Sequence, residues 1–227
     1  MTIENDIRID QTSQVAPKIE NHDWAQLAFY KDENKKISRI EEKNKRVVFV
    51  GDSITEGWSN LSPTFFSDSR FINRGISGQT TPQMLVRFRP DAIDLKPYLI
   101  IILAGTNDIA GNTGQSTEKM ITDNIFSMAE LAIGKGIKVA LSSILPVYEY
   151  SWNTSVIKPY ETIDSINAKI KFYAEENGLD YVNYFKSMVD ERRGLKDILT
   201  IDGVHPNQEG YRVMSEVVTE SINKIIS

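Results

Sequence analysis

Short apolar segments alternate with helical patterns along most of the chain. Apolar runs of this length, bounded by turn residues, are typical of strands that are buried on both faces. The predicted strands are Val47–Val50, a weaker one at Phe71–Asn73, Tyr98–Leu103, Ile137–Leu141 and Leu179–Tyr184.

Between and after these runs, apolar residues recur at the spacing of one helix face. Strands that alternate with such helices predict an α/β domain with a parallel sheet covered on both sides, and ligand sites in such sheets gather at the carboxyl ends of the strands. The helical series are Ile121, Ile125, Met128 and Ala132; Ile163, Ile166, Ile170 and Tyr173; and, in a last helix that begins near Asn207, Tyr211, Met214, Val218, Ile222 and Ile225.

The first part of the chain has a different character. Residues 1 to about 20 are polar, and we expect packing or a partner chain to hold them in place. A charge-rich helix is predicted from Asp23, as its N-cap, to about Asn44, with its charges on a solvated face. We therefore divide the chain into an extension, residues 1–45, that packs on a domain formed by residues 46–227. The apolar anchors of the predicted helix are Trp24, Leu27, Ile37 and Ile40.

Composition excludes several classes of function. Hydrophobic residues make up 41% of the 227 residues and charged ones 25%, as in soluble globular proteins, and no apolar run is long enough for a membrane segment. The net charge of −5 gives no basic footprint for nucleic acid. The chain has no cysteine and two histidines, which argues against a thiol nucleophile and a zinc site. Met1–Asp10 lacks the apolar stretch of a secretory signal, and the compartment stays open.

Candidate chemistry begins where the first predicted strand ends, in Gly51-Asp52-Ser53. A serine hydroxyl at this point would face the cleft, and the amides of a following helix would favour a developing negative charge. The alternative is that Ser53 is only the N-cap of that helix.

Two further loops follow strands in the same way. Asn107, in Gly105-Thr106-Asn107-Asp108, could donate a hydrogen bond into the cleft, or could merely close an Asx-turn. The loop Asn73–Gly78 contains two glycines, so that a backbone N–H could face a ligand there. Its spacing matches neither of the glycine-rich phosphate-binding patterns.

The last candidate is the turn from Asp202 to His205, shortly before the final helix. A carboxylate three residues before a histidine can hold one imidazole nitrogen, which leaves the other free to accept a proton. A serine hydrolase in this chain has almost no other choice of base, and we interpret His22 as structural.

Taken together, the four loops resemble the sequence blocks of the SGNH (GDSL-type) hydrolase superfamily, in the family's order, with Ile54 where the family has leucine. The amino-acid sequences of the first and third blocks are similar to those of the branch related to platelet-activating-factor acetylhydrolase subunits and bacterial acetyl esterases. The resemblance implies a three-layer α/β/α, flavodoxin-like fold with a five-stranded parallel sheet in the order 2-1-3-4-5. It also implies Ser53 as nucleophile, Asp202 and His205 as the other triad members, and Ser53, Gly75 and Asn107 as oxyanion donors, with neither cofactor nor metal.

The resulting expectation is a serine esterase that acts on a small-molecule substrate, a short acyl and preferably acetyl ester carried by a carbohydrate. A lysophospholipase or thioesterase is the alternative substrate class, and an inactive binding domain is the alternative of another kind. The loop Leu145–Tyr160 is aromatic, with Tyr148, Tyr150, Trp152 and Tyr160, and either forms a sugar-facing rim or packs itself onto the domain. A homodimer is left open.

Overall fold

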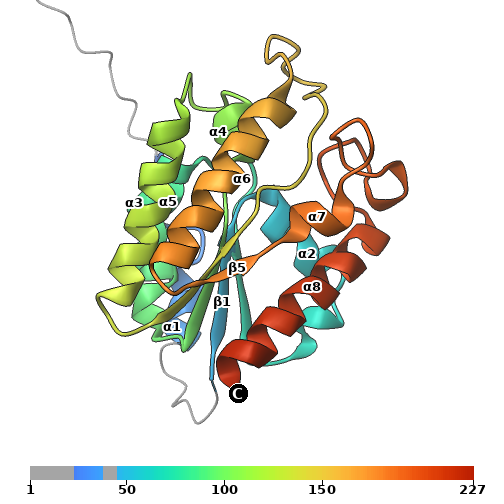
Figure 1. The fold of residues 1–227 in the computed structure, drawn as a ribbon. Coiled ribbons are helices and arrows are strands. Elements are labelled where there is room, and N and C mark those ends of the chain that lie inside the picture. The colour runs from blue at the N-terminus through green and yellow to red at the C-terminus, as the bar shows by residue number, and fades with distance from the viewer. Residues whose placement is uncertain (1–22, 38–44) are drawn as a thin grey trace, which may run out of the picture.

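A computed structural model describes residues 23–37 and 45–227 of the protein. A five-stranded sheet in the order β2-β1-β3-β4-β5 lies between two layers of helices, and all its paired strands run parallel (Figure 1). This confirms the predicted α/β/α class and the strand order. The strands are β1 Val47–Gly51, β2 Phe71–Gly75, β3 Leu99–Leu103, β4 Lys138–Ser142 and β5 Asp180–Val182.

The helices divide between the two faces of the sheet (Figure 1). One layer contains α1 Lys31–Ile37, α3 Thr81–Asp91, α5 Glu118–Ile133 and α6 Pro159–Glu176. The other contains α2 Ser53–Leu61, α7 Tyr184–Met188 and α8 Gln208–Ile226. A one-turn helix, α4 Thr106–Ile109, follows β3, and 3₁₀ turns lie at η1 Phe65–Ser67, η2 Ile93–Leu95 and η3 Asp197–Leu199.

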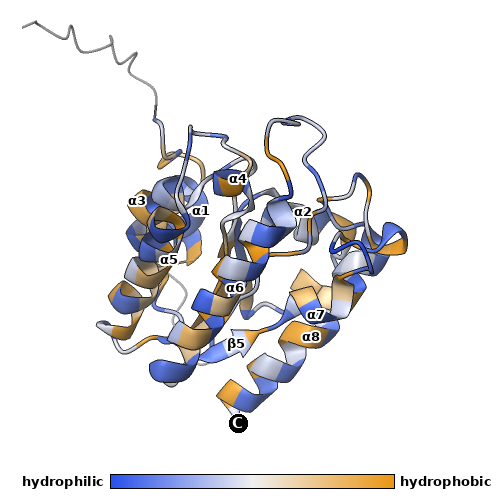
Figure 2. Ribbon diagram, turned by 45° about the horizontal axis from the view of Figure 1, so that its top comes forward, coloured by the Kyte–Doolittle hydropathy of each residue, from blue (hydrophilic) through white to orange (hydrophobic). Residues whose placement is uncertain are grey.

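The strands are continuously apolar because each helical layer buries one face. In β1, Val48 and Val50 pack toward α3, α5 and α6, whereas Val47 and Phe49 pack toward α2 and α8. Successive side chains of a strand point to opposite faces, so a sheet covered twice shows no polar alternation. The outer helices instead carry hydrophobic and hydrophilic residues on different sides, as the colouring of α6 and α8 shows (Figure 2).

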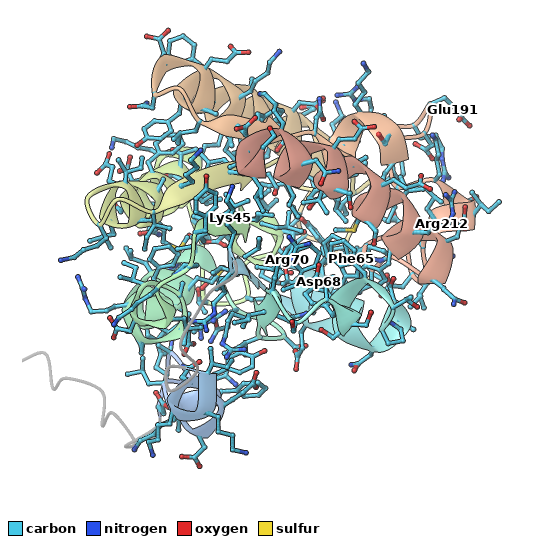
Figure 3. All side chains as sticks on the ribbon, turned by 90° about the horizontal axis from the view of Figure 1, so that it is seen from below. Lys45, Phe65, Asp68, Arg70, Glu191 and Arg212 are labelled. Atoms are coloured by element: carbon cyan, nitrogen blue, oxygen red, sulfur yellow. The ribbon has the colours of Figure 1, made fainter. Side chains whose placement is uncertain are left out.

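Two basic residues lie near the amino ends of β1 and β2, opposite the strands' carboxyl ends. Lys45 lies just before β1 and Arg70 directly precedes β2 (Figure 3). Arg70 pairs with Asp68 at 2.6 Å.

Within the described residues, no helix has both the length and the apolar character required to cross a bilayer.

Helix α3 has no counterpart among the predicted helices, although α5, α6 and α8 lie where the sequence places them. The buried residues of α3 include Gln83, Arg87 and Asp91. Apolar periodicity therefore gives no clear signal there.

The predicted N-terminal helix is wrong at its start. Residues 24–25 and 27–30 form turns on either side of Gln26, which has φ 55°, and the helix α1 begins at Lys31. Asp23 accepts the Ala28 N–H at 2.7 Å and so caps a turn. Trp24 and Leu27, predicted as apolar anchors of the helix, are 51% and 44% exposed. The first 22 residues, with His22, and residues 38–44, with Ile40, lie outside the described residues; the boundary at residue 45 stays a prediction.

Candidate active site

Ser53 is the first residue of α2, two positions after the last residue of β1. The N-cap is Asp52, whose carboxylate accepts the Ile54 N–H at 2.9 Å. The interpretation of Ser53 as only an N-cap is therefore wrong. Its hydroxyl lies 3.0 Å from His205 Nε2, which places a hydroxyl and a base within direct proton-transfer distance.

The other imidazole nitrogen, His205 Nδ1, lies 2.7 Å from Asp202 Oδ2. Asp202 Oδ1 also accepts the backbone N–H groups of Val204 and His205, at 3.0 and 2.8 Å. Partial burial would raise the pKa of Asp202, but these bonds from the His205 amide and imidazole hold that pKa below its usual range. The carboxylate thus stays ionised and fixes both the ring and the turn that carries it.

Asn107 lies in α4, which follows Gly105 at the end of β3. Its Nδ2 donates to the Gln79 carbonyl at 3.0 Å, and its Oδ1 accepts from Asn112 Nδ2, also at 3.0 Å. These partners are distant in sequence or lie in the next loop, so the side chain does not merely close an Asx-turn. Because an amide carries two N–H bonds, one remains for a ligand.

The glycine loop requires a correction. The Gly75 N–H already donates to Asn73 Oδ1 at 2.8 Å, so the predicted role of Gly75 as an oxyanion donor conflicts with the structure. Gly78 is exposed and has a positive φ of 75°. Within the described residues its N–H, like that of Ser53, has no hydrogen-bond acceptor. Asn112 joins Gly78 to Asn107, since its Nδ2 also donates to the Gly78 carbonyl at 3.2 Å.

Two buried carboxyl groups, Asp52 and Asp108, lie next to candidate site residues in the chain, and neither forms part of a metal-binding cluster of the described residues. Burial raises the pKa of Asp52 to about 6, and burial likewise raises the pKa of Asp108 to about 6. Asp108 accepts the backbone N–H and the hydroxyl of Thr81, at 2.9 and 2.6 Å, at the start of α3. Both carboxyls thus accept hydrogen bonds at a helix start. Across residues 23–37 and 45–227, no three carboxylate or imidazole side chains cluster closely enough to hold a metal ion.

The aromatic loop divides between the two roles considered for it. Tyr150 is buried and belongs to the core. Tyr148 and Tyr160 stack on each other, with ring centroids 5.7 Å apart. Trp152 is 47% exposed and lies against His205, with ring centroids 6.1 Å apart. One exposed aromatic side chain therefore borders the candidate base.

Several residues of this site were not identified from the sequence as part of it: Gly78, Asn112 and the capping Asp52. The sequence showed two glycines, Gly75 and Gly78, near the end of β2, but it could not show which of their backbone N–H groups has no acceptor. For Asn112 no local signal exists, because its partners come from two other segments.

Comparison with known proteins gives consistent matches. The sequence profile of the GDSL-like lipase/acylhydrolase family matches residues 49–213. The crystal structure of a GDSL-like lipase from Bacteroides thetaiotaomicron is 46% identical with a TM-score of 0.85, over 88% of this chain and 98% of that one.

Two esterases are more distant relatives. An acetylxylan esterase from Xylanibacter ruminicola is 26% identical over 83% of this chain, and an arylesterase from Vibrio mimicus is also 26% identical over 83% of this chain. The chain covers 93% of the arylesterase but only 45% of the acetylxylan esterase, so it spans less than half the length of the latter.

Proposed function

Because the chain belongs to the GDSL-like lipase/acylhydrolase family, we propose that it is a carboxylic ester hydrolase with Ser53 as its nucleophile. The observation that carries this proposal is the hydrogen-bonded series Ser53 Oγ, His205 Nε2, His205 Nδ1 and Asp202 Oδ2, with contacts of 3.0 and 2.7 Å. A neutral imidazole held by a carboxylate on one side can accept the serine proton on the other.

In the proposed mechanism, Ser53 Oγ attacks the ester carbonyl carbon while His205 takes its proton. The imidazolium, balanced by Asp202, then protonates the leaving alcohol, and an acyl-enzyme forms. In the second half, His205 removes a proton from water, which attacks the acyl-enzyme, and the acid leaves as Ser53 regains its proton.

The carbonyl oxygen becomes an anion in the tetrahedral intermediate and needs donors that are already oriented. We assign these to the Ser53 N–H, the Gly78 N–H and the remaining Nδ2 hydrogen of Asn107. The Ser53 amide also opens helix α2, where the helix dipole favours negative charge.

A short acyl group fits the structure better than a fatty one. The aromatic residues that follow Ser53, up to the first residue of β2, do not offer a tunnel wall because they pack on Phe49 in the core. They are Trp58, Phe65, Phe66 and Phe71, with ring centroids 5.3–5.8 Å from that of Phe49. Each methylene left in water forgoes up to about 0.8 kcal/mol of binding.

We therefore expect kcat/KM to fall along a series of p-nitrophenyl esters from acetyl to dodecanoyl, measured below their aggregation limits. A serine-directed phosphonate should abolish this activity and add its mass to the peptide that contains Ser53. A profile that climbs past eight carbons would favour the lysophospholipase or thioesterase alternative. Absence of both hydrolysis and labelling would favour an inactive binding domain.

For the alcohol part of the substrate we propose a carbohydrate. His205 protonates the leaving oxygen, so the alcohol must lie beside this ring, and Trp152 is the aromatic side chain that borders it. An exposed indole face suits the apolar face of a sugar ring, and the acetylxylan esterase among the relatives acts, by its name, on an acetylated polysaccharide.

Replacing Trp152 with alanine should raise KM for an acetylated xylo-oligosaccharide about 3- to 10-fold, as expected for loss of one aromatic stacking contact. The kinetics with ethyl acetate, whose alcohol is too small to cover the indole, should change little. Phe172→Ala, at a 64% exposed position on α6, serves as the control for loss of an exposed aromatic side chain. Equal losses on both substrates would argue against a sugar contact at Trp152.

A further inference from the structure

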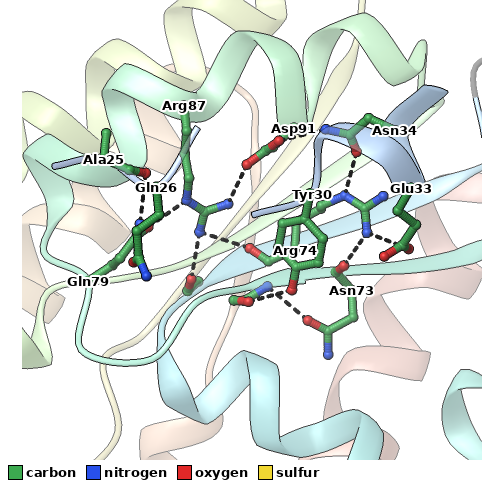
Figure 4. A network of polar contacts seen from close by, with 12 residues as sticks. Ala25, Gln26, Tyr30, Glu33, Asn34, Asn73, Arg74, Gln79, Arg87 and Asp91 are labelled. Atoms are coloured by element: carbon green, nitrogen blue, oxygen red, sulfur yellow. Dashed lines mark hydrogen bonds and ion pairs between the residues drawn. The ribbon is translucent and has the colours of Figure 1, made fainter. Parts of the chain in front are cut away.

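A segment of the N-terminal extension, residues 24–34, is bound to the loop between β2 and α3 by hydrogen bonds (Figure 4). The Tyr30 hydroxyl donates to the Gly75 carbonyl at 2.5 Å. Gln79 Nε2 donates to the Ala25 carbonyl at 3.0 Å and to Gln26 Oε1 at 3.1 Å. These contacts hold the loop Gly75–Gln79 at both of its ends.

The same loop carries two features of the candidate oxyanion site. The free N–H of Gly78 lies within it. The carbonyl of Gln79 accepts the hydrogen bond that orients Asn107 Nδ2. A displacement of the loop would therefore move the Gly78 donor and release the Asn107 donor together.

Arg87 of α3 connects this arrangement to the nucleophile (Figure 4). Its buried guanidinium donates from Nη2 to the carbonyls of Gly51 and Arg74, at 3.0 and 2.9 Å, and from Nε to Gln79 Oε1. Gly51 ends the strand that precedes Ser53. One side chain thus fixes the ends of β1 and β2 relative to the loop, and Gln79 links that side chain to the N-terminal segment.

Contacts with the buried Arg74 also hold the segment on the domain. Arg74 is fully buried and lies over the Tyr30 ring at 4.3 Å. Its Nη1 donates to Glu33 and its Nε to Asn34, both at 3.0 Å. Asn34 in turn donates to Asp91 at 2.7 Å. A buried guanidinium is costly without such partners, so Glu33 and Asn34 favour this position of the segment, although Arg74 Nη2 has no hydrogen-bond partner among the described residues. Glu33 keeps a 54% exposed side chain, as expected of a solvated face, and also pairs with the buried Arg74.

We propose that residues 24–34 position the oxyanion donors, with Tyr30 and Gln79 as positioning residues that act through Gly78 and Asn107. This inference rests on the proposed esterase function. Oxyanion donors act mainly in the transition state, and small displacements of positioned groups cost rate steeply. Loss of the segment's contacts should therefore lower kcat while leaving KM nearly unchanged.

Two substitutions in the full-length protein test this. Tyr30→Phe keeps the ring over Arg74 and removes the bond to Gly75. Gln79→Glu keeps an acceptor for Arg87 but cannot donate to Ala25. We expect each to lower kcat for p-nitrophenyl acetate about 3- to 30-fold with KM within twofold, a range below the 10²–10³ typical for loss of an entire oxyanion donor. The rate of phosphonate inactivation should fall in parallel, because the adduct's anionic oxygen uses the same donors.

The controls separate positioning from stability. Tyr98→Phe removes a hydroxyl that contacts the Ile225 carbonyl at 3.4 Å, near the amino end of β3. Asp123→Asn changes a 55% exposed side chain of α5, outside residues 24–34. Both should keep wild-type kcat when all proteins are assayed well below their Tm.

Unchanged kcat in folded Tyr30→Phe and Gln79→Glu proteins would overturn the inference, and so would a loss that appears only in KM or only in Tm. In each of those cases the wild-type esterase activity would still stand. A wild-type protein that neither hydrolyses esters nor reacts with the phosphonate would instead overturn the proposed function and this inference with it.

Discussion

Replacing Ser53 with alanine is expected to lower kcat by about 10⁴–10⁶, because the proposed mechanism forms the acyl-enzyme on the Ser53 hydroxyl. The protein should remain folded, since the cap of α2 is the Asp52 carboxylate and not the serine hydroxyl. The measurement is turnover of p-nitrophenyl acetate together with the thermal unfolding midpoint, and the phosphonate should no longer label the protein.

Ser221→Ala, within α8, is the matched control and should retain full activity. A folded Ser53→Ala protein with near-normal turnover would show that the nucleophile lies elsewhere. It would also remove the basis for the mechanism, while the fold and the family membership would be unaffected.

Asp202→Asn should lower kcat by about 10³–10⁴, because the amide would stabilise the wrong imidazole tautomer. The introduced amide could still accept the backbone N–H groups of Val204 and His205 through its oxygen, so that the turn keeps its shape. Its nitrogen, however, would donate to His205 Nδ1. The ring proton would then sit on Nε2, facing Ser53, and the base could not accept the serine proton.

The decisive measurement is kcat of Asp202→Asn at a single alkaline pH, compared with kcat of Asp197→Asn at the same pH. Asp197 is a neighbouring carboxylate whose side chain is 92% exposed and which pairs with Arg192, so its loss should leave kcat nearly unchanged. A loss in Asp202→Asn no larger than that of Asp197→Asn would mean that Asp202 holds the turn but does not orient the base.

The positions of Ser53, Asn107 and His205 show how much of the candidate site could be predicted from local sequence patterns. Ser53 and Asn107 follow apolar runs that are typical of strands buried on both faces, and parallel strands bring their carboxyl ends to one edge. His205 precedes a helix whose stripe from Tyr211 to Ile225 is unambiguous. Residue types and positions along the chain were therefore enough to place Ser53 and Asn107 at one edge of the sheet, whereas the family resemblance implied that His205 joins Ser53, and the two side chains lie 3.0 Å apart.

What the sequence by itself determined is thus the alternation of strands and helices and the segments that carry the chemistry, because both depend on local periodicity and on residue type. Only the tertiary structure decided which glycine amide is free, where the N-terminal helix begins, and that Arg87 is buried in α3. The physical reason is that these features depend on partners far along the chain. Gly75 and Gly78 differ in their acceptors and not in their residue type, and a buried arginine is stable only where distant carbonyls and a carboxylate surround it, which no local pattern records.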